Sequence, residues 1–241
     1  MLSRNDVTTR LRLMSRSSDP HILWDQQCDG SAGALVVFVG PSPGFNPRDP
    51  RKRGPRMRNC CKALWNAKYE DPLGWSGGFK TGFKPMVEAL IGVGWGRASK
   101  LMARGNLDWF GNPVSANVPE KFMRKGAPSV LAMIEDCQPS VVVPMDKRAF
   151  DVSRWALSRA GYNILDCDVT RFSVRINKGT SRHRQIYCFV AVGEEGKRIV
   201  VIKLPQHPAK LMHAGYAARC GTAVRKAAIQ IGAGRPINVS L

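Results

Sequence analysis

The 241-residue sequence lacks the features of membrane and secreted proteins. No stretch approaches the roughly 18 uninterrupted apolar residues that a membrane-spanning helix requires. The seven cysteines are an odd number, are scattered, and include no C-x-x-C spacing, which favours reduced thiols and offers no zinc or cluster site. We therefore expect a cytoplasmic monomer that carries no metal and no cofactor.

Acidic residues are also scarce. Only 18 Asp and Glu stand against 37 Lys and Arg, which gives a formal net charge of +19. A polyanionic partner is the first hypothesis, because neutralising phosphates releases condensed counterions and supplies sequence-independent affinity. An acidic membrane is the weaker rival, since no basic amphipathic helix with a continuous apolar face is present. The charge predicts DNA binding, either at the nucleoid or on invading DNA, and a generally basic surface is the alternative.

The clearest strand is a continuous apolar run at residues 34–39, the pattern of a parallel strand covered on both faces. Residues 139–145 form a second unit of this kind. A helix is predicted before it, from Ser129 to Cys137, and another after it, from Lys147 to Ala160. This alternation of strands and helices is typical of α/β proteins.

The last third of the chain has a different pattern. Residues 171–177, 185–192 and 198–204 alternate or are β-branched and are separated by turn-like segments, which predicts consecutive antiparallel strands. A helix is predicted from Tyr216 to Ile231. The expected fold is a three-layer α/β/α domain over residues 1–241, with a central, mostly parallel sheet and added antiparallel strands near the C-terminal third.

Two segments are expected to lie outside this core. Residues 1–30 predict a basic N-terminal arm or helix, and residues 46–75 predict a surface insertion, because like charges at such density cannot share a core. Residues 74–83 are rich in glycine and aromatics and predict a loop that brings backbone close to a flat ligand, or simply a connection around a packed tryptophan. The loop leads into a helix predicted at 85–91. The insertion cations expected to contact DNA are Arg48, Arg51, Lys52 and Arg53.

Two Pro- and Gly-rich motifs follow predicted strands and would meet at one edge of a parallel sheet, where α/β proteins bind ligands. They are Gly40-Pro41-Ser42-Pro43-Gly44 and His207-Pro208-Ala209-Lys210-Leu211. In order and context they resemble the first and last motifs of the uracil-DNA glycosylase superfamily. Ser115–Val118 loosely matches that superfamily's T-N-V strand, and Pro139–Ala149 matches a strand followed by a helix. The resemblance covers roughly residues 30 to 230.

The resemblance implies a role for each matched residue. His207 would donate a hydrogen bond to pyrimidine O2, where negative charge develops as the base departs, and such donors are worth about 3 kcal/mol each. Asn117 would read the Watson–Crick edge with its amide. The structural alternatives are that His207 is a surface or core histidine at the end of a strand and that Asn117 caps a turn. The residues that would form the cradle for the base are Gly40, Pro41, Pro43 and Gly44, with Phe45 or Phe79 stacked on it.

The same resemblance implies the means of base flipping. Leu211, four residues after His207, would fill the hole left in the duplex, with Met212 beside it. Packing within a helix is the alternative for Leu211. Lys210 and His213 would touch the phosphates that flank the flipped nucleotide.

Departures from the superfamily pattern concern the attacking water and the pocket wall. Ser42, kept here as a catalytic candidate, replaces the aspartate that orients this water, and Pro41 replaces the glutamate of another branch. Asn46, Asp49 or Asn117 would position the water, or the bond breaks dissociatively with electrostatic help alone. Gly44 replaces a tyrosine that excludes substituents on pyrimidine C5.

The sequence thus predicts a monofunctional DNA glycosylase that acts on uracil or on a C5-modified cytosine, such as the glucosylated hydroxymethylcytosine of phage DNA. A non-catalytic DNA-binding module on the same fold is the first rival. An unrelated nucleotide-binding α/β enzyme is the second, and the lack of both G-x-G-x-x-G and G-x-x-x-x-G-K-[ST] counts against it.

Overall fold

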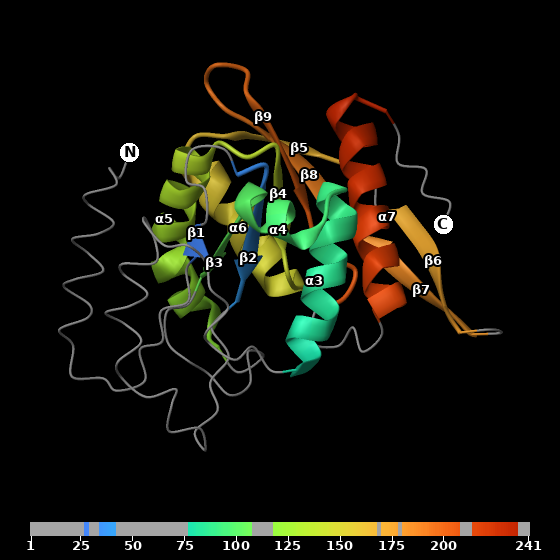
Figure 1. Cartoon of the computed structure of the whole chain (residues 1–241). Helices are drawn as coiled ribbons and strands as arrows, with labels where there is room; N and C mark the ends of the chain where they lie inside the picture. Colours follow the sequence, from blue (N-terminus) through green and yellow to red (C-terminus); the bar gives the residue numbers. More distant parts are fainter. Residues whose placement is uncertain are drawn as a thin grey trace, which may run out of the picture.

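The centre of the chain is a mixed sheet with strand order β1-β3-β2-β4-β9-β8-β5, accompanied by a separate two-stranded sheet, β6-β7 (Figure 1). The computed structural model describes residues 27–28, 34–41, 77–107, 118–167, 170–177, 180–207 and 214–235. The strands are β1 (Gln27–Cys28), β2 (Val36–Gly40), β3 (Met102–Asn106), β4 (Val141–Pro144), β5 (Asn163–Asp166), β6 (Thr170–Asn177), β7 (Thr180–Ile186), β8 (Cys188–Val192) and β9 (Arg198–Ile202).

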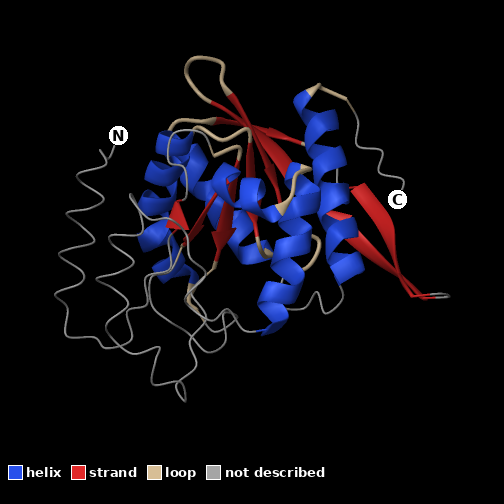
Figure 2. Cartoon of the chain, in the orientation of Figure 1, coloured by secondary structure: helices blue, strands red, loops and turns tan. Residues whose placement is uncertain are grey.

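Helices cover both faces of the large sheet, so the domain has three layers (Figure 2). The helical elements are α3 (Gly77–Ile91), α4 (Trp95–Ala98), the 3-10 helix η2 (Ser99–Leu101), α5 (Glu120–Cys137), α6 (Lys147–Arg159) and α7 (Ala214–Gly232). One hydrophobic core lies between the sheet and α3 with α7, and the other lies between the sheet and α5 with α6. The predicted α/β/α architecture is confirmed at this level.

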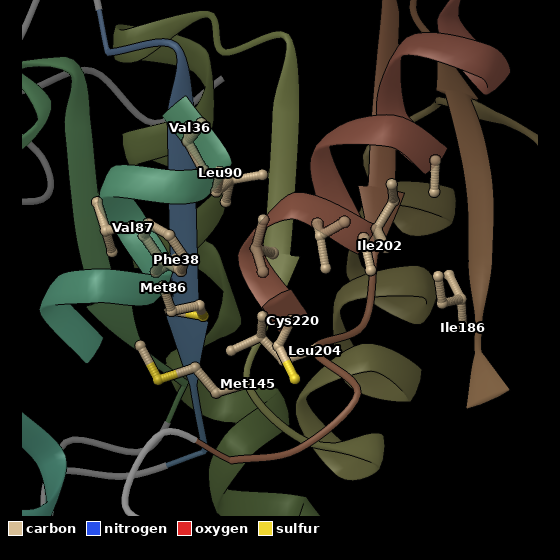
Figure 3. Close-up of a cluster of buried hydrophobic side chains, with 14 of the residues drawn as sticks. Val36, Phe38, Met86, Val87, Leu90, Met145, Ile186, Ile202, Leu204 and Cys220 are labelled. Atoms are coloured by element: carbon tan, nitrogen blue, oxygen red, sulfur yellow. The ribbon is translucent and has the colours of Figure 1, made fainter. Parts of the chain in front are cut away.

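The strand β2 shows why its sequence is apolar throughout. Phe38 belongs to the core under α3 and α7, where its ring meets Phe83 edge-on at a centroid distance of 5.0 Å. Val37 and Val39 belong to the opposite core under α5 and α6. Since successive side chains of a strand point to opposite faces, a strand covered on both faces favours apolar residues at every position. Figure 3 shows Phe38 packed with Met86 and Val87 of α3.

The helices α3 and α7 approach each other closely. At Gly221 of α7, a β-carbon would overlap the carbonyl oxygen of Met86 on α3 and would lie 3.0 Å from its carbonyl carbon. Cys220 and Val224 beside it are fully buried. Glycine at 221 therefore permits backbone contact between the two helices that form one outer layer.

Two helices begin earlier than the sequence predicts. α5 begins at Glu120 rather than near Ser129 and includes Pro128, and α3 begins at Gly77 and includes Pro85. Proline costs a helix one hydrogen bond, but burial of Met123 and Ala127 in α5, and of Phe83 in α3, offsets that loss. The prediction of a glycine-rich loop through residue 83 is therefore wrong for residues 77–83.

The strand β3 was not predicted. Its sequence, Met-Ala-Arg-Gly-Asn, contains a charged residue and a glycine, yet all five residues are buried because β3 pairs with β1 on one side and β2 on the other. Its position in the sheet, rather than its own propensity, makes it a strand. Val118, the last residue of the proposed T-N-V strand, lies in the bend before α5 instead.

The C-terminal third also differs from expectation. Residues 185–192 are two strands, β7 and β8, separated by Tyr187, and β5 is a further strand that the pattern did not indicate. β8 and β9 are antiparallel as predicted, but β9 is also parallel to β4 and therefore belongs to the parallel core. The predicted pairing of consecutive antiparallel strands thus holds for β8 with β9. β6 and β7 also pair with each other, but in a separate sheet.

The predicted basic arm at 1–30 and the insertion at 46–75 lie outside the described residues, apart from β1. That strand falls inside the predicted arm and pairs with Ala103 and Arg104, so at residues 27–28 the chain belongs to the sheet rather than to an arm or helix. Within the described ranges, no helix has the length and apolarity needed to cross a membrane.

Candidate functional site

The four parallel strands β3, β2, β4 and β9 end at one edge of the sheet, which we call the carboxyl edge. From β2 the chain goes first to β3 on one side and then to β4 on the other. A reversal of this kind is a topological switch point, and open α/β sheets bind ligands outside the strand ends at such points. The fold therefore directs attention to the residues that follow these four strands.

Backbone hydrogen bonds hold the strand exits together. The N–H of Leu107 donates to the carbonyl of Gly40 at 2.9 Å, and that of Met145 donates to Val39 at 2.8 Å. The N–H of Leu204 donates to Pro144, also at 2.8 Å. The first residue or two after each strand is thus fixed to its neighbour, and the carboxyl edge is a continuous platform from β3 to β9.

Gly40 and Asn106 lie side by side on this platform, because β2 and β3 pair them in register. A β-carbon at residue 40 would overlap Oδ1 of Asn106 and lie 3.3 Å from its Cγ. Asn106 is only 5% exposed, and Pro41 is buried as well. Glycine at residue 40 is therefore what leaves room for a buried amide at the switch point.

Asn106 was not among the predicted site residues because β3 was not predicted from the sequence. An amide offers a donor and an acceptor at one site, which suits recognition of a heterocycle edge. The available signal was an asparagine that ends a short segment located between two predicted units of the fold. Residues 102–106 include Arg104, Gly105 and Asn106, which do not form an apolar strand pattern, so the segment was not predicted as a strand.

His207 follows β9 at the far end of the parallel strands. The segment leading to it is held in place, since Leu204 and Pro205 are buried and the hydroxyl of Tyr216 in α7 donates to Oε1 of Gln206 at 3.1 Å. His207 itself is half-buried. The structure thus brings His207 to the same edge as Gly40 and Pro41, as predicted from the two motifs.

A buried cation lies close behind this edge. Arg104 is on β3, two residues before Asn106 and in register with Phe38, and it is 5% exposed. Burial lowers the pKa of Arg104 to about 10, so the guanidinium stays charged at neutral pH. A positive charge in such surroundings is poorly screened by solvent.

Further cations lie where α5 and α6 begin, at this same edge. Arg148 of α6 donates to the carbonyl of Val118, just before α5. Lys121 and Lys125 flank the exposed ring of Phe122, with each ammonium within 6.0 Å of its centroid. The starts of α5 and α6 thus carry these cations together with the acidic residues Glu120 and Asp146.

Asp146 is a carboxylate at this edge, directly after β4. It is the N-cap of α6, and its Oδ1 accepts the N–H of Ala149 at 2.7 Å. A carboxylate in this position satisfies an otherwise unpaired amide and complements the helix dipole. This arrangement gives Asp146 a structural role.

Asp146→Ala is expected to lower the free energy of unfolding by about 1 kcal/mol, because α6 loses its cap. Asp146→Asn should leave the stability nearly unchanged, since asparagine caps equally well. Chemical denaturation of both variants measures the difference. Equal losses for alanine and asparagine would mean that the negative charge, and not the cap, stabilises α6.

Of the remaining predicted site residues, the structure describes only Phe79. Phe79 is in the first turn of α3, on the chain segment that follows the predicted insertion. The others lie outside the described residues: Ser42, Pro43, Gly44, Phe45, Asn46, Arg48, Arg51, Lys52, Arg53, Asn117, Lys210, Leu211, Met212 and His213. Their roles stay predictions.

Among the described residues, no group of three or more His, Cys, Asp or Glu side chains is arranged to hold a metal ion. Comparison of the sequence with protein-family models and with curated protein sequences finds no match.

Proposed function

We propose that this protein is a monofunctional DNA glycosylase that flips a pyrimidine out of the helix and hydrolyses its N-glycosidic bond. The observation that carries the proposal is that Gly40, Asn106 and His207 all follow or end parallel strands at the carboxyl edge of the sheet, where it has its switch point. The net charge of +19 supplies the affinity for the DNA backbone. The finer fold proposed is that of the uracil-DNA glycosylases.

The chemistry needs a donor beside the departing base. As the bond between C1′ and the ring nitrogen breaks, the base keeps the electron pair and its negative charge is greatest on O2. A hydrogen bond from His207 stabilises that charge. Water adds to C1′ and its proton neutralises the base, which leaves an abasic sugar.

Recognition of the base is assigned to the amide of Asn106. The amide is buried at the end of β3 and pressed against Gly40, so its position is set before any ligand arrives. A preorganised donor and acceptor pair matches the Watson–Crick edge of a pyrimidine. Asn117 stays a second candidate for this role.

Two substrates fit the proposal, uracil and a cytosine with a bulky C5 substituent. Gly44 supports the second, because glycine leaves the C5 side open where a tyrosine would close it. We favour neither by sequence alone, so the substrate assay includes both.

The rival function is a DNA-binding module without turnover. The observation in its favour is that Asp146, a carboxylate at the described edge, is engaged as a helix cap, while the motif at residues 40–44 contains none. Such a module would bind DNA through the same cations and leave every base in place.

One experiment separates these functions. The purified protein is incubated with duplex and single-stranded DNA containing uracil, a thymine mismatch, hydroxymethylcytosine or its glucosylated form, and alkali then cleaves any abasic site. Strand scission on one of these substrates supports the glycosylase. Tight, salt-sensitive binding without scission on any of them supports the module.

Gly40→Ala is expected to slow base excision about 100-fold, since its methyl group displaces the Asn106 amide and misplacement by about 1 Å can cost that much. Single-turnover excision rates measure the effect. Gly94→Ala is the matched control, because a β-carbon there meets nothing within 4 Å.

The double variant Gly40→Ala/Asn106→Ala tests the cause. The overlap with the Asn106 amide should also lower the thermal stability of Gly40→Ala. If that overlap is responsible for the slower excision, the double variant should regain the thermal stability but not the activity. Normal excision by Gly40→Ala would argue against Asn106 as the base-reading residue.

A further inference from the structure

The strands β6 and β7 form an antiparallel ribbon that is not part of the large sheet. They pair from Thr170 with Ile186 at the root to Asn177 with Thr180 near the turn. In Figure 1 the ribbon leaves the body beside α7 and extends away from it. Among the described residues no third strand pairs with the ribbon, and α7 contacts β6. An isolated two-stranded ribbon is marginally stable in water, which suggests a further function for it.

Its composition suggests a reason. Residues 170–186 contain five Lys or Arg and no Asp or Glu, so the ribbon is more strongly basic than the chain as a whole. The cations are Arg171, Arg175, Lys178, Arg182 and Arg184. A segment whose charges are all positive is a candidate binding element for a polyanion.

The pairing register distributes these cations along the ribbon. Arg171 pairs with Gln185 and Arg175 with Ser181, whereas Arg182 and Arg184 pair with Val174 and Phe172. Neighbouring positions of a β-ladder alternate between its faces, so the arginines are divided between both faces. The register therefore places arginine positions on both faces of the ribbon.

The root of the ribbon is attached to the carboxyl edge. β7 ends at Ile186, which is fully buried, and the carbonyl of the next residue, Tyr187, accepts the N–H of Lys203 at 2.9 Å. Lys203 lies between β9 and His207. The ribbon thus starts from the same sheet edge as the proposed active site.

An ion pair holds the other side of the root. Asp166, at the end of β5, receives hydrogen bonds on both carboxylate oxygens from Arg154 of α6, one of them at 2.8 Å. This pairing lowers the pKa of Asp166 and raises that of Arg154. Both strands that lead into the ribbon are therefore fixed to the body.

Lysines connect the root with the active-site edge. The ammonium groups of Lys147 and Lys203 lie 5.6 Å and 5.2 Å from the centroid of the Tyr187 ring. Asp151 partly neutralises Lys147. Lys203 after β9 and Lys147 of α6 thus both lie at Tyr187, the residue that follows the ribbon.

We infer that the β6–β7 ribbon is a second DNA contact that enters a groove of the duplex beside the flipped base. The major groove, about 12 Å wide, admits a two-stranded ribbon. Eight residues of β6 extend roughly 26 Å, which is most of one turn of duplex. The inference rests on the proposed function for its partner, but it does not require base excision.

The first test removes charge from the ribbon. The variant R171Q/R175Q/R182Q/R184Q is compared with R97Q/K100Q/R159Q/R198Q, which removes the same charge from exposed positions on other elements. Binding to a 30-base-pair duplex is measured against salt concentration. The ribbon variant should lower the slope of log Kd against log salt by about 3, and the control by less than about 1.

Controls make this result decisive. Arginine-to-lysine changes at the same four positions keep the charge and should keep the slope. Equal slope changes in the ribbon variant and the control variant would overturn the inference. An equal loss of slope on a single-stranded oligonucleotide would overturn the placement in a duplex groove.

A second test does not depend on the multiple variant folding. A photo-crosslinking amino acid is placed at Asn177, near the ribbon turn, or at Glu195, in the exposed β8–β9 turn at the opposite sheet edge. Duplex DNA should crosslink to residue 177 and not to residue 195. The reverse pattern, or no crosslink at 177 while the duplex is bound, contradicts the inference even if the protein proves to be an active glycosylase.

Discussion

His207→Ala is expected to slow base excision about 100-fold or more, while leaving salt-sensitive duplex binding nearly intact. The reason is that the histidine acts on charge that appears only as the base departs, and loss of one such donor typically costs 10²–10³ in rate. Single-turnover excision and equilibrium binding are measured on the same oligonucleotide. His207→Asn, which keeps an N–H donor on a shorter side chain, should retain more activity than alanine.

Tyr216→Phe is the control that tests whether the position of His207, rather than its hydrogen-bond donor, accounts for the loss of excision. It removes the hydroxyl that donates to Gln206, next to His207, and keeps the buried ring in α7. Excision should fall by less than about 10-fold, because Leu204 and Pro205 still anchor the segment. If His207→Ala weakens binding as much as it slows excision, the histidine is a phosphate contact and not a leaving-group donor.

Gly221→Ala is expected to have the largest effect on stability. The added methyl group overlaps the Met86 carbonyl oxygen, and a backbone atom cannot rotate away, so α3 and α7 must separate. Overpacking of this kind costs about 1–3 kcal/mol, and the upper end is expected here. Chemical denaturation measures the loss.

Gly215→Ala, on the same helix, is the matched control. A β-carbon at residue 215 meets nothing within 4 Å, so the substitution removes a flexible residue without a clash. Its stability should be unchanged or higher by up to about 1 kcal/mol. A similar loss in both variants would mean that glycine at 221 does not permit the close packing of α3 and α7.

The packing of α3 against α7 is expected to matter for function as well as for stability. α3 covers the face of the sheet on which Phe38 and Gly40 lie, and α7 follows the segment that contains His207. Figure 3 shows Leu204 and Cys220 close to each other in this same core. Loosening α7 by Gly221→Ala is therefore expected to affect the position of His207 as well as the stability.

Some parts of the fold could be predicted because their own residues carry the signal. β2 and β4 are continuous apolar runs, since both faces of each strand are covered. α6 begins and ends within one residue of the prediction, and Asp146 before it is a typical N-cap. Apolar runs and caps are local consequences of burial and of unpaired amides, so they can be read from the sequence.

Other parts could not. β3 is a strand because β1 and β2 supply hydrogen bonds on both of its sides, and no property of Met-Ala-Arg-Gly-Asn indicates this. The start of α3 at Gly77 depends on a core that buries Phe83, and the two strands within residues 185–192 separate where the ribbon leaves the sheet. These features result from contacts between residues distant in the sequence.

By itself, then, the sequence determined the α/β alternation, the strong positive charge and the two strand exits that carry Gly40 and His207. Only the tertiary structure decided which residues lie beside Gly40, because strand order and register are set by pairing across the sheet. That pairing placed Asn106 against Gly40 and put the charge of Arg104 behind them. It also attached the basic β6–β7 ribbon to the same edge, through backbone contacts that no local pattern encodes.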